Sequence, residues 1–151
     1  MSTPLHPARR VWLARAFAFA LASALAPFAA AQPRLGRRDW RAIRKVITRQ
    51  LAALRAGDGE QAFDWASPGI RAQFGDAQTF LAMVRGAYAA LLDARYTEFL
   101  DGAVIDGIII QPLRLIAPDN SVRVALYTLE RLPNGWRISG CRLAPSTVQA
   151  A

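Results

Sequence analysis

The sequence predicts an α+β domain in which N-terminal helices pack on a curved antiparallel sheet. Three observations indicate this fold class. Apolar residues recur three or four positions apart up to about residue 92, β-branched and aromatic residues cluster after residue 96, and turn residues divide that second half into short strands. Because the spacing changes only once, helices are expected first and strands afterwards, as in an α+β domain.

The first half contains four predicted helices. The strongest begins with Asp39 as its N-cap, ends at Gly57 and carries one apolar face, formed by Trp40, Ile43, Ile47, Leu51 and Leu54. A short second helix starts with a capping-box-like Asp58, and Ser67-Pro68 supplies a cap and an N1 proline for a third. Asp76 caps the last helix, which is expected to run to about residue 92.

The second half is predicted to form a meander of four strands. Their expected ranges are Tyr96 to Leu100, Gly107 to Ala117, Val122 to Leu132 and Trp136 to Leu143. Pro112 cannot donate a ladder hydrogen bond, so an edge or a bulge is predicted there. Together with the helices, these strands are expected to bury one core that contains Trp40, Ile43, Ile47, Leu51, Phe63, Phe74, Phe80, Val84, Leu126 and Ile138.

Residues 1–31 have the pattern of a secretory signal peptide. A basic start without acidic residues precedes an apolar run over residues 16–26, which is too short to span a bilayer, and Ala29-Ala30-Ala31 offers cleavage before Gln32. We expect a periplasmic or secreted protein without a stable membrane anchor after cleavage, exported by the general secretory route in preference to the twin-arginine route. A basic flexible segment over 32–38, a single domain over 39–145 and a disordered tail over 146–151 complete the expected organisation.

The chain is strongly basic, with a formal net charge of +8 that falls to about +5 without the signal arginines. Much of the excess lies between Arg34 and Lys45, where it could attract anionic lipid, lipopolysaccharide or a glycan. Arginine outnumbers lysine eighteen to one, a bias that a GC-rich genome produces without selection for binding, so a solvated basic face is favoured. Nucleic acid is not an expected partner, because export is expected and the tract lacks interleaved aromatic residues.

Histidine and cysteine are nearly absent, which excludes several chemistries. The only histidine is His6, inside the predicted signal, so the mature chain has no imidazole for a Ser-His-Asp triad or a histidine metal site. Cys141 is the only cysteine and cannot form an intrachain disulfide or a thiolate zinc site. We therefore expect neither a metal nor a cofactor.

Carboxylates remain the one route to catalysis, because burial in a pocket can raise the pKa of an acid until it transfers protons near neutral pH. The first candidate is Asp64, which lies between Phe63 and Trp65, although an exposed helix position is the favoured explanation of this residue. The other acidic candidates are Glu98, Asp101, Asp106 and Glu130.

Cys141 has two interpretations. By strand alternation it shares a face with Arg137 and Leu143 and lies opposite Ile138, a pattern that does not decide its exposure. It is either a buried structural thiol or one that pairs between chains or senses redox state, with its pKa lowered by a nearby arginine such as Arg142.

Four further residues could place a hydrogen-bonding group in a ligand pocket, or could be packed residues whose hydrogen bonds are satisfied within the fold: Tyr88, Gln111, Tyr127 and Trp136.

Several short runs together resemble a known family. They are Ala62-Phe63, Ala66-Ser67-Pro68, Phe74-Gly75, Met83-Val84, Ala125-Leu126-Tyr127, Glu130-Arg131, Gly135-Trp136-Arg137-Ile138 and Gly140-Cys141. In this order they resemble an exported bacterial family catalogued as domain of unknown function 4864, from about Trp40 to Leu143. The resemblance implies an exported domain with a cone-shaped α+β fold similar to the nuclear-transport-factor-2 and ketosteroid-isomerase group, and no established activity. The chain departs from the family pattern at residues 89–92, which replace a proline-rich turn.

Two classes of function fit these observations. The sequence offers many apolar residues that could line a pocket and no convincing pair of acidic residues for catalysis. These features favour a non-catalytic binding module for a small apolar molecule or an envelope protein. The alternative is a carboxylate-dependent lyase or isomerase on the same scaffold, and fold analogy alone does not decide between them. A homodimer is compatible with either class.

Overall fold

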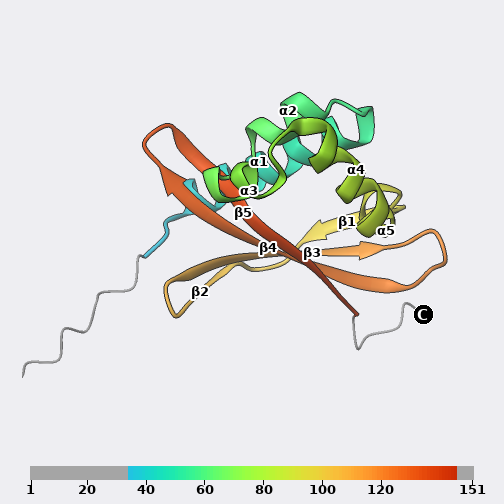
Figure 1. Ribbon diagram of the computed structural model, residues 1–151. Helices are drawn as coiled ribbons and strands as arrows, with labels where there is room; N and C mark the ends of the chain where they lie inside the picture. The colour runs from blue at the N-terminus through green and yellow to red at the C-terminus, as the bar shows by residue number, and fades with distance from the viewer. Residues whose placement is uncertain (1–33, 146–151) are drawn as a thin grey trace, which may run out of the picture. The chain divides into compact units, whose positions relative to one another are not determined.

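The computed structural model describes residues 34–145, so the predicted signal peptide and the tail over 146–151 lie outside the described part of the chain. Within it, helices precede strands (Figure 1), which confirms the predicted α+β class. The elements are α1 (Arg37–Ala56), α2 (Gly59–Asp64), α3 (Pro68–Phe74), α4 (Ala77–Ala87), α5 (Ala89–Leu92), β1 (Tyr96–Phe99), β2 (Ala103–Ile105), β3 (Ile108–Ile116), β4 (Val122–Leu132) and β5 (Gly135–Pro145). None of these helices is long and apolar enough to cross a membrane.

Helix α1 begins earlier than the sequence predicts. Its N-cap is Gly36, whereas Asp39 lies in the first turn, where its carboxylate accepts a hydrogen bond from the Gly36 N–H at 3.0 Å. The prediction of Asp39 as the cap was therefore wrong, and Arg37 and Arg38 belong to the helix and not to a flexible segment over 32–38. The predicted stop is confirmed, since Gly57 takes the left-handed conformation with φ of 73°.

The next three caps are confirmed, but the last helix is shorter than predicted. The side chains of Asp58, Ser67 and Asp76 each accept a hydrogen bond from the backbone N–H three residues later, at 3.0, 3.3 and 2.7 Å. Tyr88 leaves the helical conformation with φ of −123° and ψ of 25°, so the helix divides into α4 and the single turn α5.

The sheet is antiparallel with the order β1-β3-β4-β5, and β2 extends it by pairing with the start of β3. Sequence reasoning missed β2. Its hairpin with β3 turns through Asp106 and Gly107, which have positive φ of 50° and 77°, a conformation that the Asp-Gly pair adopts readily.

Pro112 lies in the middle of the sheet, so the predicted edge or bulge was wrong. Strand β1 pairs with residues 113–116 of β3 and strand β2 with residues 108–110, so Pro112 falls in the gap between two ladders. Its carbonyl accepts a hydrogen bond from the Leu100 N–H at 3.1 Å. Because the nitrogen and carbonyl of a strand residue point to the same side, the missing N–H faces this gap and costs β4 no hydrogen bond.

A β-bulge changes the alternation of β5. Thr128 pairs with Gly140 and Leu129 pairs with Ile138, so Ser139 is an extra residue in β5. The extra residue turns Cys141 toward the same core as Ile138, and both pack against the same apolar cluster. The prediction that Cys141 lies on the face opposite Ile138 was therefore wrong.

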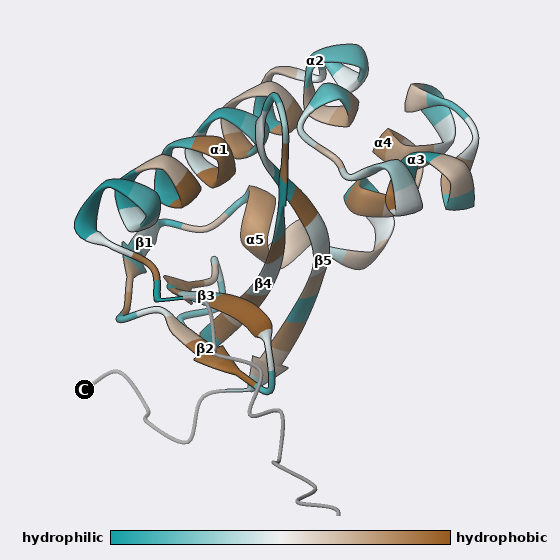
Figure 2. Ribbon diagram, turned by 90° about the vertical axis from the view of Figure 1, so that its left-hand side faces the viewer, coloured by the Kyte–Doolittle hydropathy of each residue, from teal (hydrophilic) through white to brown (hydrophobic). Residues whose placement is uncertain are grey.

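The face of β4 that packs under the helices also differs from the prediction. Ala125, Tyr127 and Leu129 are buried, whereas Leu126 on the alternate face is only partly buried. Figures 1 and 2 show the helices on one side of the sheet, and on the other side Ile105 and Ile108 of the β2–β3 hairpin remain exposed.

The core consists of two apolar clusters and not of the single predicted one. The sheet cluster joins α1 and α5 to the sheet and includes Ile43, Ile47, Leu51, Leu91, Leu113, Leu115, Tyr127, Trp136 and Ile138. The helix cluster joins the end of α1 to α2 and α4 and includes Leu54, Phe63, Phe80, Leu81 and Val84. Of the predicted core residues, Trp40 and Phe74 lie at the margins of these clusters and are only partly buried.

Candidate functional site

A pocket of about 460 Å³ lies where the two apolar clusters meet, beside strand β5. Tyr88 packs against both clusters and separates α4 from α5 at this point. The pocket is lined by Gln50 and Leu54 of α1, Ile70, Gln73 and Phe74 of α3, Phe80, Met83 and Val84 of α4, Tyr88, Leu91, Tyr127 of β4, and Ile138, Ser139, Gly140 and Cys141 of β5.

The walls of the pocket are largely apolar, and its polar groups gather at one wall. The Tyr88 hydroxyl donates a hydrogen bond to the Cys141 carbonyl at 2.6 Å. Tyr127 lies directly across from Cys141 in the β4–β5 ladder, and its hydroxyl is hydrogen-bonded to the Cys141 thiol. The structure thus brings together three of the predicted site residues, Tyr88, Tyr127 and Cys141.

These three groups are uncharged at neutral pH. Burial raises the pKa of the Cys141 thiol to about 12, and the hydrogen bond from Tyr127 only partly opposes this effect. Burial also raises the pKa of Tyr88 and raises that of Tyr127 well above its usual value. A thiolate activated by nearby arginines was one interpretation of Cys141, and the burial that raises the pKa of this thiol disfavours it.

The bulge at Ser139 shapes the pocket wall. Ser139 Oγ donates to Thr128 Oγ1 at 3.1 Å, which fixes the extra residue against β4. Gly140 follows it, and a Cβ atom there would lie 2.7 Å from Thr128 Oγ1, so a larger residue would require the Thr128 hydroxyl to move.

Two predicted site residues lie away from the pocket. Gln111 is fully buried and closes the gap between β1 and β2, where its Nε2 donates to the carbonyls of Leu100 and Pro112 at 2.7 and 3.0 Å. Its Oε1 accepts from Arg44 Nε at 3.3 Å. Trp136 is buried in the sheet cluster, with the guanidinium of Arg131 5.1 Å from its ring centroid. Both residues make structural contacts, and neither lines the pocket.

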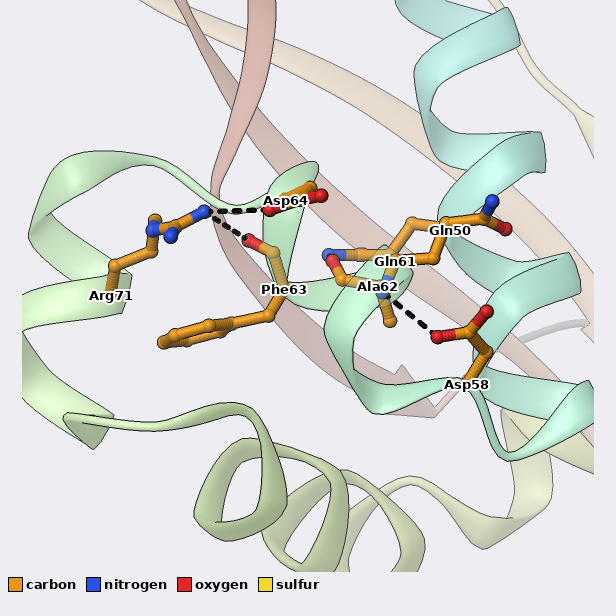
Figure 3. A network of polar contacts seen from close by, with 7 residues as sticks. All are labelled: Gln50, Asp58, Gln61, Ala62, Phe63, Asp64 and Arg71. Carbon is orange, nitrogen blue, oxygen red and sulfur yellow. Dashed lines mark hydrogen bonds and ion pairs between the residues drawn. The ribbon is translucent and has the colours of Figure 1, made fainter.

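Asp64 is exposed, and its side chain points to Arg71 (Figure 3). Its side chain is 71% exposed, and its carboxylate pairs with Arg71 at 3.1 Å. Arg71 also donates to the Phe63 carbonyl and stacks on the Phe63 ring at 4.9 Å. This carboxylate faces water and a surface arginine, so the environment that would suit it to acid–base chemistry is missing.

The other acidic candidates also lie outside the pocket. Glu98 forms an ion pair with Arg114, Glu130 sits opposite Arg137 in the ladder, and Asp101 and Asp106 are exposed. Among residues 34–145, the pocket lining includes no aspartate or glutamate, and no three acidic, histidine or cysteine side chains come close enough to hold a metal ion.

Sequence reasoning missed most of the lining. Phe74 and Phe80 were assigned to the core, because an amphipathic pattern does not distinguish a core from a pocket wall. The signals that could have located the pocket are the non-helical Tyr88 and the Ser139-Gly140 pair, at which helix and strand both lose their regular geometry.

The chain is similar to a solved structure from Streptomyces avermitilis, an NTF2-like family protein proposed to be a dehydratase, with 15% identity, a TM-score of 0.48, and coverage of 74% of this chain and 98% of that chain. At this level the likeness carries no information about activity. No match is found among curated proteins. The family described as a domain of unknown function (DUF4864) matches residues 37–151, most of the chain, and so the protein belongs to this family.

Proposed function

We propose that this domain binds a small, neutral and largely apolar molecule in the pocket beside β5, without transforming it. The observation that carries the proposal is the pocket itself: its volume of about 460 Å³ falls within the range of small-molecule sites, and its walls are mainly aliphatic and aromatic. The two apolar clusters do not fill the space where they meet, and the side chains around that space are mainly apolar.

The polar groups of the pocket favour a ligand that carries one or two hydrogen-bonding atoms. Tyr88 and Tyr127 each place a hydroxyl oxygen at the β5 wall, and an oxygen that donates one hydrogen bond still has lone pairs to accept another. Since the tyrosines and the thiol are neutral, an ionic ligand would find no counter-charge among the lining residues.

The alternative of a carboxylate-dependent lyase or isomerase finds no support in the described lining. That chemistry needs an acid held near the substrate with a raised pKa, and Asp64, its first candidate, is exposed and paired with Arg71. The neutral pocket therefore favours binding over proton transfer.

A pair of variants on one helix tests the proposal. Met83 lines the pocket, whereas its neighbour Ala82 is exposed and does not. The Met83→Trp change should fill the pocket and weaken binding of the neutral fluorophore N-phenyl-1-naphthylamine at least tenfold. The Ala82→Trp change, which adds the same indole outside the pocket, should leave binding within about twofold.

Equal binding by both variants, or no saturable binding by the unchanged protein, would contradict the proposal. Mass spectrometry of the purified protein under non-denaturing conditions complements the dye, since a retained molecule should be lost from Met83→Trp and kept in Ala82→Trp.

We also propose that the domain acts outside the cytoplasm. The support is the pattern of residues 1–31, with a basic start, an apolar run and an Ala-x-Ala cleavage site. The amino terminus of protein recovered from the cell envelope should then begin at or within a few residues of Gln32, and an intact Met1 on the soluble protein would contradict export with cleavage.

A further inference from the structure

Charge is distributed unevenly along the chain. Residues 34–55 contain eight basic residues and one acidic residue, whereas residues 56–145 contain eight basic and ten acidic residues. A genomic bias toward arginine would raise the arginine content throughout and would not remove acids from one segment. The concentration of positive charge around α1 therefore needs a local explanation.

The helix geometry gathers this charge on one side of α1. At 100° per residue, positions 37, 41, 45 and 49 follow one another in steps of about 40°, and position 38 falls between 45 and 49, so all five lie within an arc of about 120°. The face opposite them is buried in the sheet cluster, and Figure 2 shows hydrophilic residues of α1 on the side away from the sheet. We call this set the basic stripe: Arg37, Arg38, Arg41, Lys45 and Arg49, all exposed.

Within the described residues, no residue of the stripe forms an ion pair. The only acid of α1, Asp39, is half-buried off this side and pairs with Arg131 at 3.2 Å. The other ion pairs join Arg71 to Asp64 and Arg114 to Glu98, on other elements. Like charges four residues apart repel one another, so the stripe costs helix stability unless an anionic partner compensates.

We propose that the basic stripe binds the phosphate groups of an anionic membrane surface. The 20 residues of α1 extend over about 30 Å, and no residue of the stripe lines the pocket beside β5, so the stripe suits a broad surface and not an enclosed anion. Guanidinium groups bind phosphate oxygens in pairs, and basic residues next to an anionic membrane add their contributions one by one. Among the described residues, the one ring recorded against the stripe is Trp65, 5.5 Å from the guanidinium of Arg49, whereas single-stranded nucleic acid stacks on a series of rings.

The position of α1 also favours a membrane over a soluble polyanion. Ten residues separate the apolar run ending at Ala26 from Arg37, a reach of about 35 Å when extended. Until the cleavage proposed above removes the run, this length of chain keeps the stripe within about 35 Å of any membrane that the run enters. Gln50 and Leu54 of α1 line the pocket from the opposite side of the helix, so binding through the stripe leaves the pocket free.

Vesicle binding by two matched triple variants of the full chain tests the proposal. The stripe variant carries Arg37→Gln, Arg41→Gln and Lys45→Gln, and the control variant carries Arg85→Gln, Arg95→Gln and Arg142→Gln, which are exposed residues on other segments. Co-sedimentation is compared between phosphatidylcholine vesicles with and without about a third of phosphatidylglycerol. All of these proteins carry the apolar run, which contributes equally to binding of the two kinds of vesicle. The ratio of the affinity for anionic vesicles to the affinity for neutral vesicles therefore isolates the effect of charge.

The unchanged protein should prefer the anionic vesicles, and 0.5 M salt should remove this preference. The stripe variant should lose about fivefold in affinity per residue, on the order of 100-fold in total, while the control variant changes less than fivefold. Equal losses in both variants would show a net-charge effect and overturn the proposal, as would the absence of any preference. Stripe-dependent binding to heparin without binding to vesicles would overturn it in favour of a soluble polyanion.

Discussion

Gly102 offers a direct test of how α1 is seated on the sheet. The glycine lies between β1 and β2, and a Cβ atom built on it would come within 2.2 Å of Cζ3 of Trp40, with two further ring carbons at 2.6 and 2.7 Å. Carbon atoms in van der Waals contact are about 3.5–4.0 Å apart. The Gly102→Ala change therefore forces the indole to move by more than an ångström or the strand connection to shift.

The magnitude of the penalty follows from the packing of Trp40. Inserting a methyl group into a packed site costs about 1–3 kcal/mol, and full loss of a buried Trp costs about 3–5 kcal/mol. Because Trp40 is only partly buried, at the start of the first helix, the indole has some freedom to move. We expect a loss of about 2 kcal/mol in the free energy of unfolding. Gly102 is not among the glycines with positive φ, so the loss comes from the ring contact and not from backbone strain.

A double-mutant cycle measured by urea denaturation separates this contact from other effects of the new methyl group. Gly102→Ala, Trp40→Ala and the double variant are compared with the unchanged protein. Once the ring is removed, Gly102→Ala should cost less than about 0.5 kcal/mol, within the range of ordinary surface substitutions. An equal cost with and without Trp40, or no cost in the presence of Trp40, would refute the packing of Trp40 on Gly102.

Two further changes test the core and the pocket wall. Ile47→Ala should lower the free energy of unfolding by about 2–5 kcal/mol in urea denaturation, because Ile47 is fully buried in the sheet cluster; a loss below about 1 kcal/mol would mean that another face of α1 is buried. For Cys141, whose thiol pKa is about 12 in the folded protein and about 8.5 when unfolded, the unfolded state loses its proton first. Stability should therefore fall as the pH rises above about 8.5, iodoacetamide should react far more slowly with the folded than with the urea-unfolded protein, and Cys141→Ser should flatten the pH dependence between 8.5 and 10.

The helical half of the fold could be predicted from local chemistry. The caps at Asp58, Ser67 and Asp76 act through hydrogen bonds to amides three residues away, so sequence alone contains the information. The start of the first helix was misplaced because Asp39 serves equally well as a cap or as a first-turn residue that receives the Gly36 N–H. Only the path of the chain before Asp39 decides between these two roles.

The sheet was predicted less completely, because its details depend on pairing between distant residues. Pro112 is tolerated in the third strand only because the first and second strands leave a gap beside it, and Gln111 fills that gap with side-chain hydrogen bonds. No local rule reveals such a gap. The second strand could have been found from Asp106-Gly107, a hairpin signal between two β-branched runs.

The candidate site could not be predicted mainly because one residue changes the geometry around it. Without an extra residue at Ser139, the alternation of the fifth strand would turn the Cys141 side chain away from Ile138 and from the helices. The bulge instead brings the thiol to Tyr127 and the Cys141 carbonyl to Tyr88, at the break between the fourth and fifth helices. A regular alternation of side chains along the strand predicts that these groups lie on opposite faces, whereas the folded chain places them on one pocket wall. The polar groups of the pocket therefore depend on the bulge, and a residue larger than Gly140 would have to displace the Thr128 hydroxyl to which Ser139 is bonded.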